Sequence, residues 1–89
     1  MGFHVYILEC ADGTYYTGMT NNLERRLKEH NAKRGGRYTR GKTPVVLKYA
    51  EPQGTFKEAM VRELEIKGYA RPRKARLIEG GKKVRKKKS

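Results

Sequence analysis

The sequence predicts a small domain of the α/β class, of the α+β type, in which short strands and helices share one core. Two β-rich runs, His4–Cys10 and Tyr15–Met19, flank an Asp-Gly pair, which is a strong signal for a β-hairpin. A third β-rich run, Val45–Ala50, precedes a segment with a clear helix N-terminal cap. Because the chain has only 89 residues, there is no room for a second core.

The register of the hairpin depends on the length of its loop. A three-residue loop, Ala11-Asp12-Gly13, with Gly13 in the left-handed conformation, places Tyr6 opposite Gly18 and Tyr16 opposite Leu8. Both tyrosines then share one face of the sheet, whereas a two-residue loop would put them on opposite faces. The shared face predicts a functional site, although the general preference of strands for tyrosine is the simpler alternative.

The first helix is predicted over residues 23–31, with Asn21 as its N-cap and Glu24 completing a capping box. Arg26 and His30 lie on or beside its apolar stripe. Burying such groups without partners is costly, so we expect them to face something polar. A histidine favoured by the helix dipole and an arginine whose stem covers apolar surface are the structural alternatives.

A glycine-rich basic segment, Lys33–Lys42, follows the first helix. Several cations and one aromatic ring on a flexible backbone are typical of a phosphate-contacting loop or short helix. A solvated loop without a ligand is the alternative. The candidate nucleic-acid-binding residues are Lys33, Arg34, Arg37, Tyr38, Arg40 and Lys42, together with Lys67 in a later helix.

The third strand, Val45–Ala50, has apolar residues on both faces, so we expect either a central strand or a sheet covered on both sides. Pro52-Gln53-Gly54 is expected to end it. Thr55 then opens a capped helix that reaches about Tyr69.

Glu63 lies on the apolar stripe of that second helix. A buried carboxylate is tolerated when it is paired or binds a metal. Lys67, one turn further on, is the possible ion-pair partner that would give Glu63 a purely structural role.

The C-terminal part is predicted as a short helix over residues 72–79 that ends at Gly80-Gly81. Residues 82–89 carry six positive charges and nothing to bury, so we expect disorder. The chain thus divides into a folded domain, residues 1–79, and a basic tail, residues 80–89.

Charge is the strongest compositional signal. Lysine and arginine number 22 against 9 acidic residues, for a formal net charge of +13. Such an excess favours a polyanionic partner, most often nucleic acid. A solubilising surface is the alternative, but such surfaces usually mix both signs.

The sequence also predicts the cellular setting. With Cys10 as its single cysteine, the chain is expected to have no intramolecular disulfide and no cysteine-based zinc site. No apolar stretch is long enough for a signal peptide or a membrane span. We therefore expect a cytoplasmic protein with no membrane partner.

Together these features resemble the GIY-YIG nuclease family, in particular its small stand-alone branch. His4-Val5-Tyr6 stands in place of the first signature and Tyr16-Thr17-Gly18 in place of the second. The order of the following features supports the resemblance: the start of the first helix, then Arg26, His30 and Glu63. It covers roughly residues 3–78. Two departures are His4 in place of glycine and the lack of any asparagine after Asn31.

The resemblance implies a three-stranded antiparallel sheet with helices packed around it. It also implies hydrolysis of DNA phosphodiester bonds, in structure-directed processing or repair, with one divalent cation, Mg²⁺ or Mn²⁺. Glu63 would hold the metal, Tyr6 would activate or position water, Tyr16 and His30 would complete the site, and Arg26 would stabilise charge on the phosphate. Which of Tyr6, Tyr16 and His30 takes the proton stays open.

Two other functions fit the composition. The first is a nucleic-acid-binding module that cuts slowly or not at all. The second is a small RNA-associated structural protein, which would leave the placement of Glu63 and the tyrosines unexplained. With no room for a targeting domain, specificity would come from DNA shape, from the basic segment, or from a protein partner.

Overall fold

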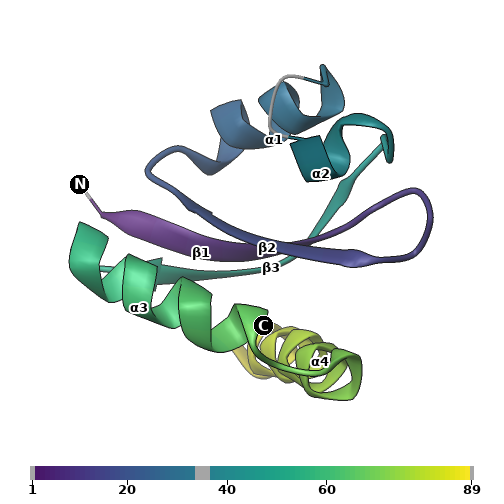
Figure 1. Cartoon of the computed structure of the whole chain (residues 1–89). Coiled ribbons are helices and arrows are strands. Elements are labelled where there is room, and N and C mark those ends of the chain that lie inside the picture. The colour runs from purple at the N-terminus through teal and green to yellow at the C-terminus, as the bar shows by residue number, and fades with distance from the viewer. Residues whose placement is uncertain (1, 34–36, 89) are drawn as a thin grey trace.

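The computed structural model describes residues 2–33 and 37–88, without the side chains of residues 37, 38 and 81–88. The elements are β1 (Phe3–Glu9), β2 (Tyr15–Thr20), α1 (Leu23–Asn31), α2 (Arg37–Arg40), β3 (Val46–Gln53), α3 (Phe56–Lys67) and α4 (Arg71–Lys88). The strands form one antiparallel sheet in the order β2-β1-β3. The predicted α+β fold with a three-stranded antiparallel sheet is confirmed (Figure 1).

The hairpin has the predicted register. Tyr6 pairs with Gly18 and Leu8 with Tyr16. Gly13 has a φ of 87°, the left-handed conformation that the three-residue loop requires. Asp12 supports the turn because its Oδ1 accepts a hydrogen bond of 3.1 Å from the backbone N–H of Thr14. The loop parity therefore brings the two tyrosines to one face.

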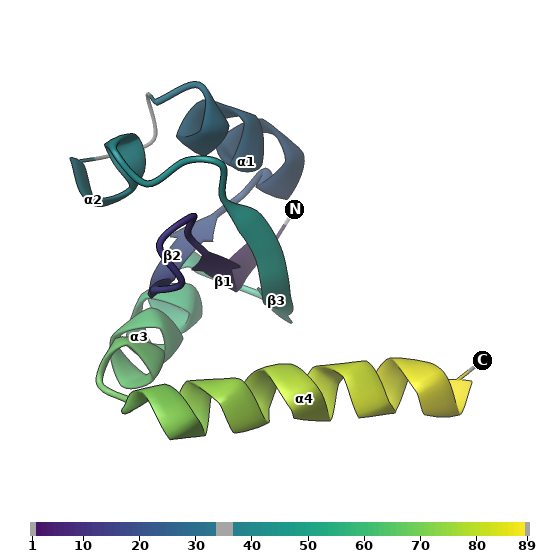
Figure 2. The same cartoon turned by 90° about the vertical axis from the view of Figure 1, so that its right-hand side faces the viewer.

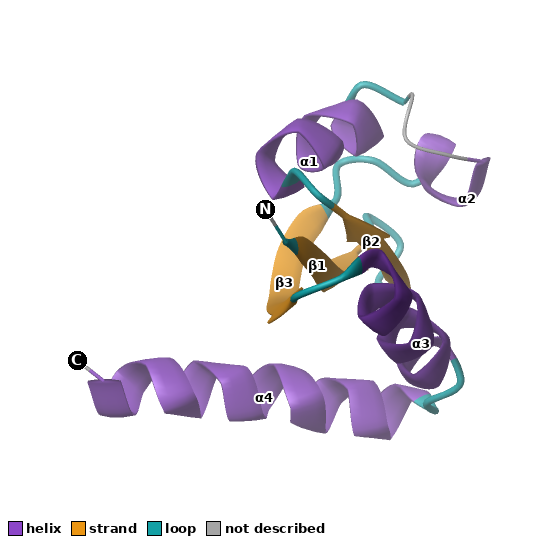
Figure 3. Ribbon diagram, turned by 90° about the vertical axis from the view of Figure 1, so that its left-hand side faces the viewer, coloured by secondary structure: helices purple, strands orange, loops and turns teal. Residues whose placement is uncertain are grey.

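Helices cover both faces of the sheet. In Figure 3 the strands lie between α1 and α2 on one side and α3 and α4 on the other. The core on the α3 and α4 side contains Val5, Ile7, Ala59, Ile66 and Ile78. The core on the α1 side contains Tyr6, Leu8, Cys10 and Val45. Since β1 is central and covered on both faces, all of its residues from Val5 to Leu8 are buried.

The N-cap of α1 is Asn22, so the prediction of Asn21 was wrong by one residue. The Asn22 side-chain oxygen accepts a hydrogen bond of 3.0 Å from the backbone N–H of Arg25. Thr20 selects this position, because its Oγ1 accepts a hydrogen bond of 3.1 Å from the Asn22 backbone N–H. The cap of α3 is as predicted, with Thr55 Oγ1 accepting a hydrogen bond of 3.1 Å from the backbone N–H of Glu58.

The strand β3 lies at the edge of the sheet, not at its centre. The alternative expectation, a sheet covered on both sides, is the correct one. The strand ends within the predicted Pro52-Gln53-Gly54 break, at Gln53, but Pro52 does not interrupt it, because it pairs opposite His4. Proline lacks only the N–H, and an edge strand tolerates that loss since its outer side has no neighbouring strand.

The last helix is longer than predicted. It runs from Arg71 to Lys88 and includes Gly80-Gly81, where the sequence predicted an end and then a disordered tail (Figure 2). Glycine lowers helix propensity but keeps its N–H, so it weakens a helix without blocking it. The division into a domain of residues 1–79 and a tail of residues 80–89 stays a prediction. Across the described residues, none of the helices is both long and apolar enough to span a bilayer.

Two polar contacts fix the helices to the sheet. The Asn31 side chain pairs with the main chain of Val45, accepting from its N–H at 2.7 Å and donating to its C=O at 3.3 Å, which ties the end of α1 to the start of β3. On the other face, Arg62 of α3 donates to both carboxylate oxygens of Glu51 in β3, at 2.7 and 3.3 Å. Burial alone would raise the pKa of Glu51, but hydrogen bonds from Arg62 and Tyr49 outweigh it and lower the pKa.

Candidate active site

Tyr6 and Tyr16 form the sheet side of the candidate site. Tyr6 is buried, and its ring crosses the neighbouring strand at Gly18. A Cβ atom at Gly18 would lie 2.5 Å from the Tyr6 hydroxyl oxygen, so glycine is required for this close approach. The two tyrosine rings are 6.5 Å apart between centroids. The predicted shared face is therefore present, with the glycine supplying the space.

His30 contributes from α1 and connects three elements. Its Nε2 lies 3.1 Å from the hydroxyl of Tyr6, and its ring packs edge-on against Tyr16 with centroids 5.3 Å apart. Its Nδ1 lies 2.7 Å from the Oγ1 of Thr39 in α2. His30 and Thr39 are each 1% exposed. Both ring nitrogens of a fully buried histidine are thus satisfied, as burial requires.

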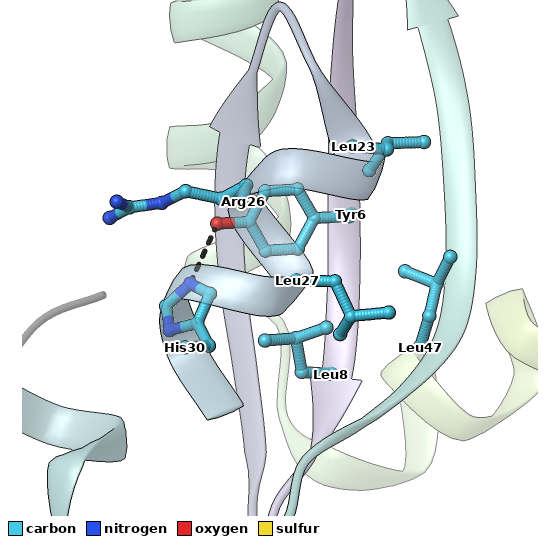
Figure 4. A pocket seen from close by; sticks show the side chains of 7 residues that line it. All are labelled: Tyr6, Leu8, Leu23, Arg26, Leu27, His30 and Leu47. Atoms are coloured by element: carbon cyan, nitrogen blue, oxygen red, sulfur yellow. Dashed lines mark hydrogen bonds between the residues drawn. The ribbon is translucent and has the colours of Figure 1, made fainter. Parts of the chain in front are cut away.

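Arg26 lies one turn before His30 on α1. It donates from Nη1 to Glu29 at 3.0 Å and is also hydrogen-bonded to Tyr6. Figure 4 shows the Arg26 guanidinium and the Tyr6 hydroxyl on the same side of the site. The other side is closed by leucines, Leu8, Leu23, Leu27 and Leu47, which leave no room for water. The site therefore has one dry apolar wall and one polar end.

The environment of Tyr6 and His30 sets their protonation. Burial raises the pKa of Tyr6; the hydrogen bond with Arg26 opposes the rise, while Tyr16 and Glu63 add to it. Burial also lowers the pKa of His30, and the positive charge of Arg26 lowers it further. Near neutral pH, Tyr6 is thus a phenol and His30 a neutral imidazole.

The hydrogen bonds also define the tautomer of His30. A guanidinium has donors only, so Arg26 donates to the Tyr6 oxygen, and the Tyr6 O–H is directed to His30 Nε2. A neutral imidazole has a single N–H. We assign that proton in His30 to Nδ1, which lies 2.7 Å from Thr39 Oγ1, because Nε2 faces the Tyr6 hydroxyl. Nε2 of His30 is therefore a proton acceptor placed at the Tyr6 hydroxyl.

Glu63 of α3 approaches from the other layer. Its side chain is 16% exposed, and its Oε2 lies 3.6 Å from Nζ of Lys67. The ion pair with Lys67, the structural alternative, is therefore present. Glu63 is nevertheless close enough to raise the pKa of Tyr6. Since the Lys67 side chain is 47% exposed, it can turn into solvent at small cost when Glu63 takes another partner.

The donor set fits Mg²⁺ better than Zn²⁺. Within residues 2–33 and 37–88, no group of three or more His, Cys, Asp or Glu residues could hold a metal ion. Zinc needs three or four such ligands, whereas Mg²⁺ is held by one or two carboxylates together with water and substrate phosphate oxygens. Glu63 is one mostly buried carboxylate within electrostatic reach of Tyr6, so a single Mg²⁺ or Mn²⁺ ion is compatible with these residues.

The basic segment is only partly described. Lys33 and Arg40 are exposed, and Lys42 forms an ion pair of 3.4 Å with Asp12. Arg34 lies outside the described residues, as do the side chains of Arg37 and Tyr38. Nucleic-acid binding by this segment and by Lys67 stays a prediction. Part of the segment is the short helix α2, in keeping with the expected loop or short helix.

Thr39 is the site residue that the sequence reasoning missed. It contacts His30 from a different helix, nine positions along the chain, so no helical or strand periodicity links the two positions. A hydroxyl residue inside a glycine-rich basic run was the only available signal, and such residues are common in loops.

The geometry has a counterpart among known proteins. A sequence model of the GIY-YIG catalytic domain matches residues 2–76. The chain belongs to the GIY-YIG family. This assignment confirms the resemblance predicted from the two tyrosine signatures, and family membership indicates nuclease activity in general, with DNA as the substrate class.

Relatives within the GIY-YIG family are UPF0213 proteins. One from Halobacterium salinarum is 53% identical over 75 residues, which are 84% of this chain and 97% of that protein. One from Staphylococcus haemolyticus is 47% identical over 76 residues, which are 85% of this chain and 93% of that protein.

Two solution NMR structures share the fold. A UPF0213 protein from Bacillus halodurans aligns with a TM-score of 0.57 at 42% identity, covering 89% of this chain and 84% of that one. A protein from E. faecalis aligns with a TM-score of 0.62 at 35% identity, covering 90% and 85%.

Proposed function

We propose that the protein is a metal-dependent endonuclease that hydrolyses phosphodiester bonds in DNA, with a preference set by DNA structure. The observation that carries the proposal is the hydrogen-bonded set of Tyr6, Arg26 and His30, with the carboxylate of Glu63 within electrostatic reach. Packing alone would leave these positions apolar, because burying polar groups without function gains nothing for stability.

Each residue has a defined chemical task in this proposal. Glu63 would hold one Mg²⁺ or Mn²⁺ ion, which when bound polarises the phosphate and its attacking water. Arg26 stays charged at every relevant pH and donates in a planar fork that matches phosphate oxygens, so it stabilises negative charge as the phosphorus becomes five-coordinate.

Tyr6 and His30 would accept the proton that the attacking water gives up. Tyr6 cannot be a base while it is a phenol, since its pKa is raised by burial. Its oxygen can take a proton from water only as its own proton passes to His30 Nε2, 3.1 Å away. The new P–O bond forms as the bond to the leaving oxygen breaks. That oxygen takes a proton from solvent water, and the proton that left Tyr6 is held on His30. Tyr16 packs on His30 and keeps the imidazole in place.

The test is cleavage of linear, nicked, flapped and branched DNA with and without Mg²⁺, using wild type, Glu63→Gln and Arg26→Ala. We expect cleavage by wild type that is lost with chelator and falls at least ~100-fold in both variants. Glu58→Gln is the matched control, because Glu58 is an exposed carboxylate on the same helix. Magnesium-dependent cutting that persists in Glu63→Gln would contradict the proposal.

The second candidate is a nucleic-acid-binding module without efficient chemistry. The ion pair of 3.6 Å between Glu63 and Lys67 favours it, since it satisfies the carboxylate without a metal. This candidate predicts a gel shift by wild type and Glu63→Gln alike, with no cleavage in any divalent metal.

A further inference from the structure

A groove continues from the polar end of the site to the edge of the sheet. It has a volume of about 340 Å³, at the lower end of the ~300–1,000 Å³ typical of small-ligand pockets. It is lined by α1, by the end of β2 and the turn that follows it, by the N-terminal end of β1 and by the first residue of α3. Figure 1 shows α1 and α3 on opposite faces of the sheet, so the groove crosses the sheet edge between them. Arg26 lines both the groove and the candidate site.

Two phenylalanines form the apolar wall of this groove. The rings of Phe3 and Phe56 meet edge to face with centroids 5.6 Å apart and an interplanar angle of 71°. Phe56 is 56% exposed, although it is a large apolar residue at the start of α3. An exposed aromatic face beside cations is the arrangement on which an unstacked base packs.

The part of the groove lining that α1 supplies is basic. Arg25 and Arg26 both line the groove, and they share one carboxylate, Glu29, at 3.9 and 3.0 Å. Two guanidinium groups against one carboxylate leave one net positive charge. Because the Arg25 side chain is 64% exposed, its surface ion pair is weak and can be exchanged for a phosphate.

We propose that this groove binds one unpaired nucleotide next to the phosphate held by Arg26, with the base on Phe56 and the backbone on Arg25. The inference rests on the proposed function and specifies its substrate class, namely DNA with a single-stranded branch. A base inside a duplex has both faces covered by its neighbours, so only an unpaired base can present a face to Phe56.

Binding of DNA in the absence of metal tests the proposal independently of cleavage. The DNA is a duplex with a single-stranded overhang, compared with the same duplex without the overhang and with versions that carry an abasic site at each overhang position. The variant is Phe56→Leu, which keeps apolar cover over Phe3. Leu64→Ala is the control, because Leu64 is 61% exposed on the same helix but does not line the groove.

We expect Phe56→Leu to weaken binding of overhang DNA ~10-fold relative to blunt duplex, in line with the loss of one base stack. An abasic site at one overhang position should weaken DNA binding by wild type by a similar factor. The same abasic site should weaken binding by Phe56→Leu little further, since both changes remove the same stacking interaction. Leu64→Ala should bind as wild type does. Thermal unfolding of each variant checks that the fold is retained.

The subsite would be overturned if Phe56→Leu bound each DNA as tightly as wild type does. It would also be overturned if Phe56→Leu lost the same factor in affinity for overhang DNA and for blunt duplex. If wild type cleaves branched DNA and Phe56→Leu shows no selective loss, the nuclease proposal stands and the subsite fails. If wild type cleaves none of the DNAs, while Phe56→Leu selectively weakens binding of overhang DNA, the subsite stands and the nuclease proposal fails.

Discussion

His30 links Tyr6 to Thr39 in the candidate site. It is neutral, it is 1% exposed, and its two nitrogens have different roles. In the assigned tautomer, Nδ1 donates to Thr39 and Nε2 accepts from Tyr6. If the tautomer were reversed, Nε2 would carry a proton and no group would receive the Tyr6 proton. Thr39 is thus a positioning residue that acts through His30.

Thr39→Val tests this role. Valine fills nearly the same volume but cannot accept the Nδ1 proton, so the tautomer is no longer fixed. We expect cleavage to fall ~10–100-fold, as for loss of an outer-shell partner of a reactive imidazole, and Thr39→Ser to restore most of it. Nitrogen-15 NMR of the His30 ring should show the Nδ1–H form in wild type and mixed tautomers in Thr39→Val. Unchanged cleavage and an unchanged spectrum would contradict the assignment.

The pH dependence of cleavage follows from the lowered pKa of His30. Burial and Arg26 disfavour the imidazolium in the folded state, so the unfolded chain binds this proton more readily. The associated stability is fully present above the ordinary value of about 6.5 and is lost as the pH falls through the lowered pKa. The proton-accepting form of Nε2 is lost over the same interval.

We therefore expect cleavage to persist below pH 6.5 and to decline only at lower pH, with NMR titration of His30 giving the same midpoint. His30→Gln should lose most of the activity, and its remaining cleavage rate should no longer decline at low pH. Titration of His30 above its ordinary value would contradict the prediction.

At the scale of elements, the hairpin shows what the sequence can predict. Its register follows from the number of loop residues and the twofold alternation of strands, so Tyr6 and Tyr16 could be placed together from local signals. The contact of His30 with Thr39 could not, because it depends on how α2 packs rather than on spacing. Pro52 and Gly80 misled for a related reason. Proline disfavours strands and glycine disfavours helices by local preference. In this fold the free-energy cost was outweighed, for Pro52 in an edge strand and for Gly80 in a long helix.

Strand β2 contains one poorly satisfied residue. Thr17 is 2% exposed, pairs with Ile7 and faces the core beneath α3. Among the described residues, its Oγ1 is a buried side-chain oxygen with no hydrogen-bond partner. A buried hydroxyl in this state lowers stability, because it has given up its hydrogen bonds to water.

Thr17→Val should therefore raise the free energy of unfolding by about 1 kcal/mol, because it replaces the hydroxyl with a methyl group in an apolar setting. Denaturation in urea measures this as a higher midpoint at unchanged slope. Thr14→Val is the matched control. Its hydroxyl donates to Asp12 at 2.6 Å, so its loss should destabilise the turn. A lower midpoint for Thr17→Val would show that the hydroxyl has a partner.

For the whole molecule, the proposed function predicts that net charge governs association with DNA while the site governs cleavage. The net charge is +13, of which six positive charges lie in residues 82–89. Each phosphate that the protein no longer neutralises should make the slope of log affinity against log salt less negative by ~0.9. Chemistry at Tyr6, Arg26 and His30 does not depend on those distant charges, so affinity and the pattern of cleavage products should separate.

Replacing the lysines and arginine of residues 82–88 with glutamine keeps the length of α4 and removes the charge. We expect at least ~10-fold weaker DNA binding near 100 mM salt and a shallower salt dependence, with cleavage at the same positions in the substrate. Fluorescence anisotropy over a salt series measures both quantities. An unchanged slope would mean that this end of α4 does not touch the phosphates.

The pairing of Asn31 with Val45 has a consequence for how this fold changes over time. Asn31 and Val45 flank the chain segment that carries the basic positions. Two hydrogen bonds from the amide side chain of Asn31 to the main chain of Val45 hold the two ends of this segment together. Because the two ends of the segment are joined in this way, its length and charge can change while the helix before it and the strand after it keep their places. Further contacts tie the segment to the rest of the fold: the Thr39 hydroxyl meets His30, and the Lys42 C=O accepts a hydrogen bond of 2.8 Å from the Ala11 backbone N–H. If the segment binds nucleic acid as predicted, changes within this one stretch of chain would alter substrate preference without rebuilding the site.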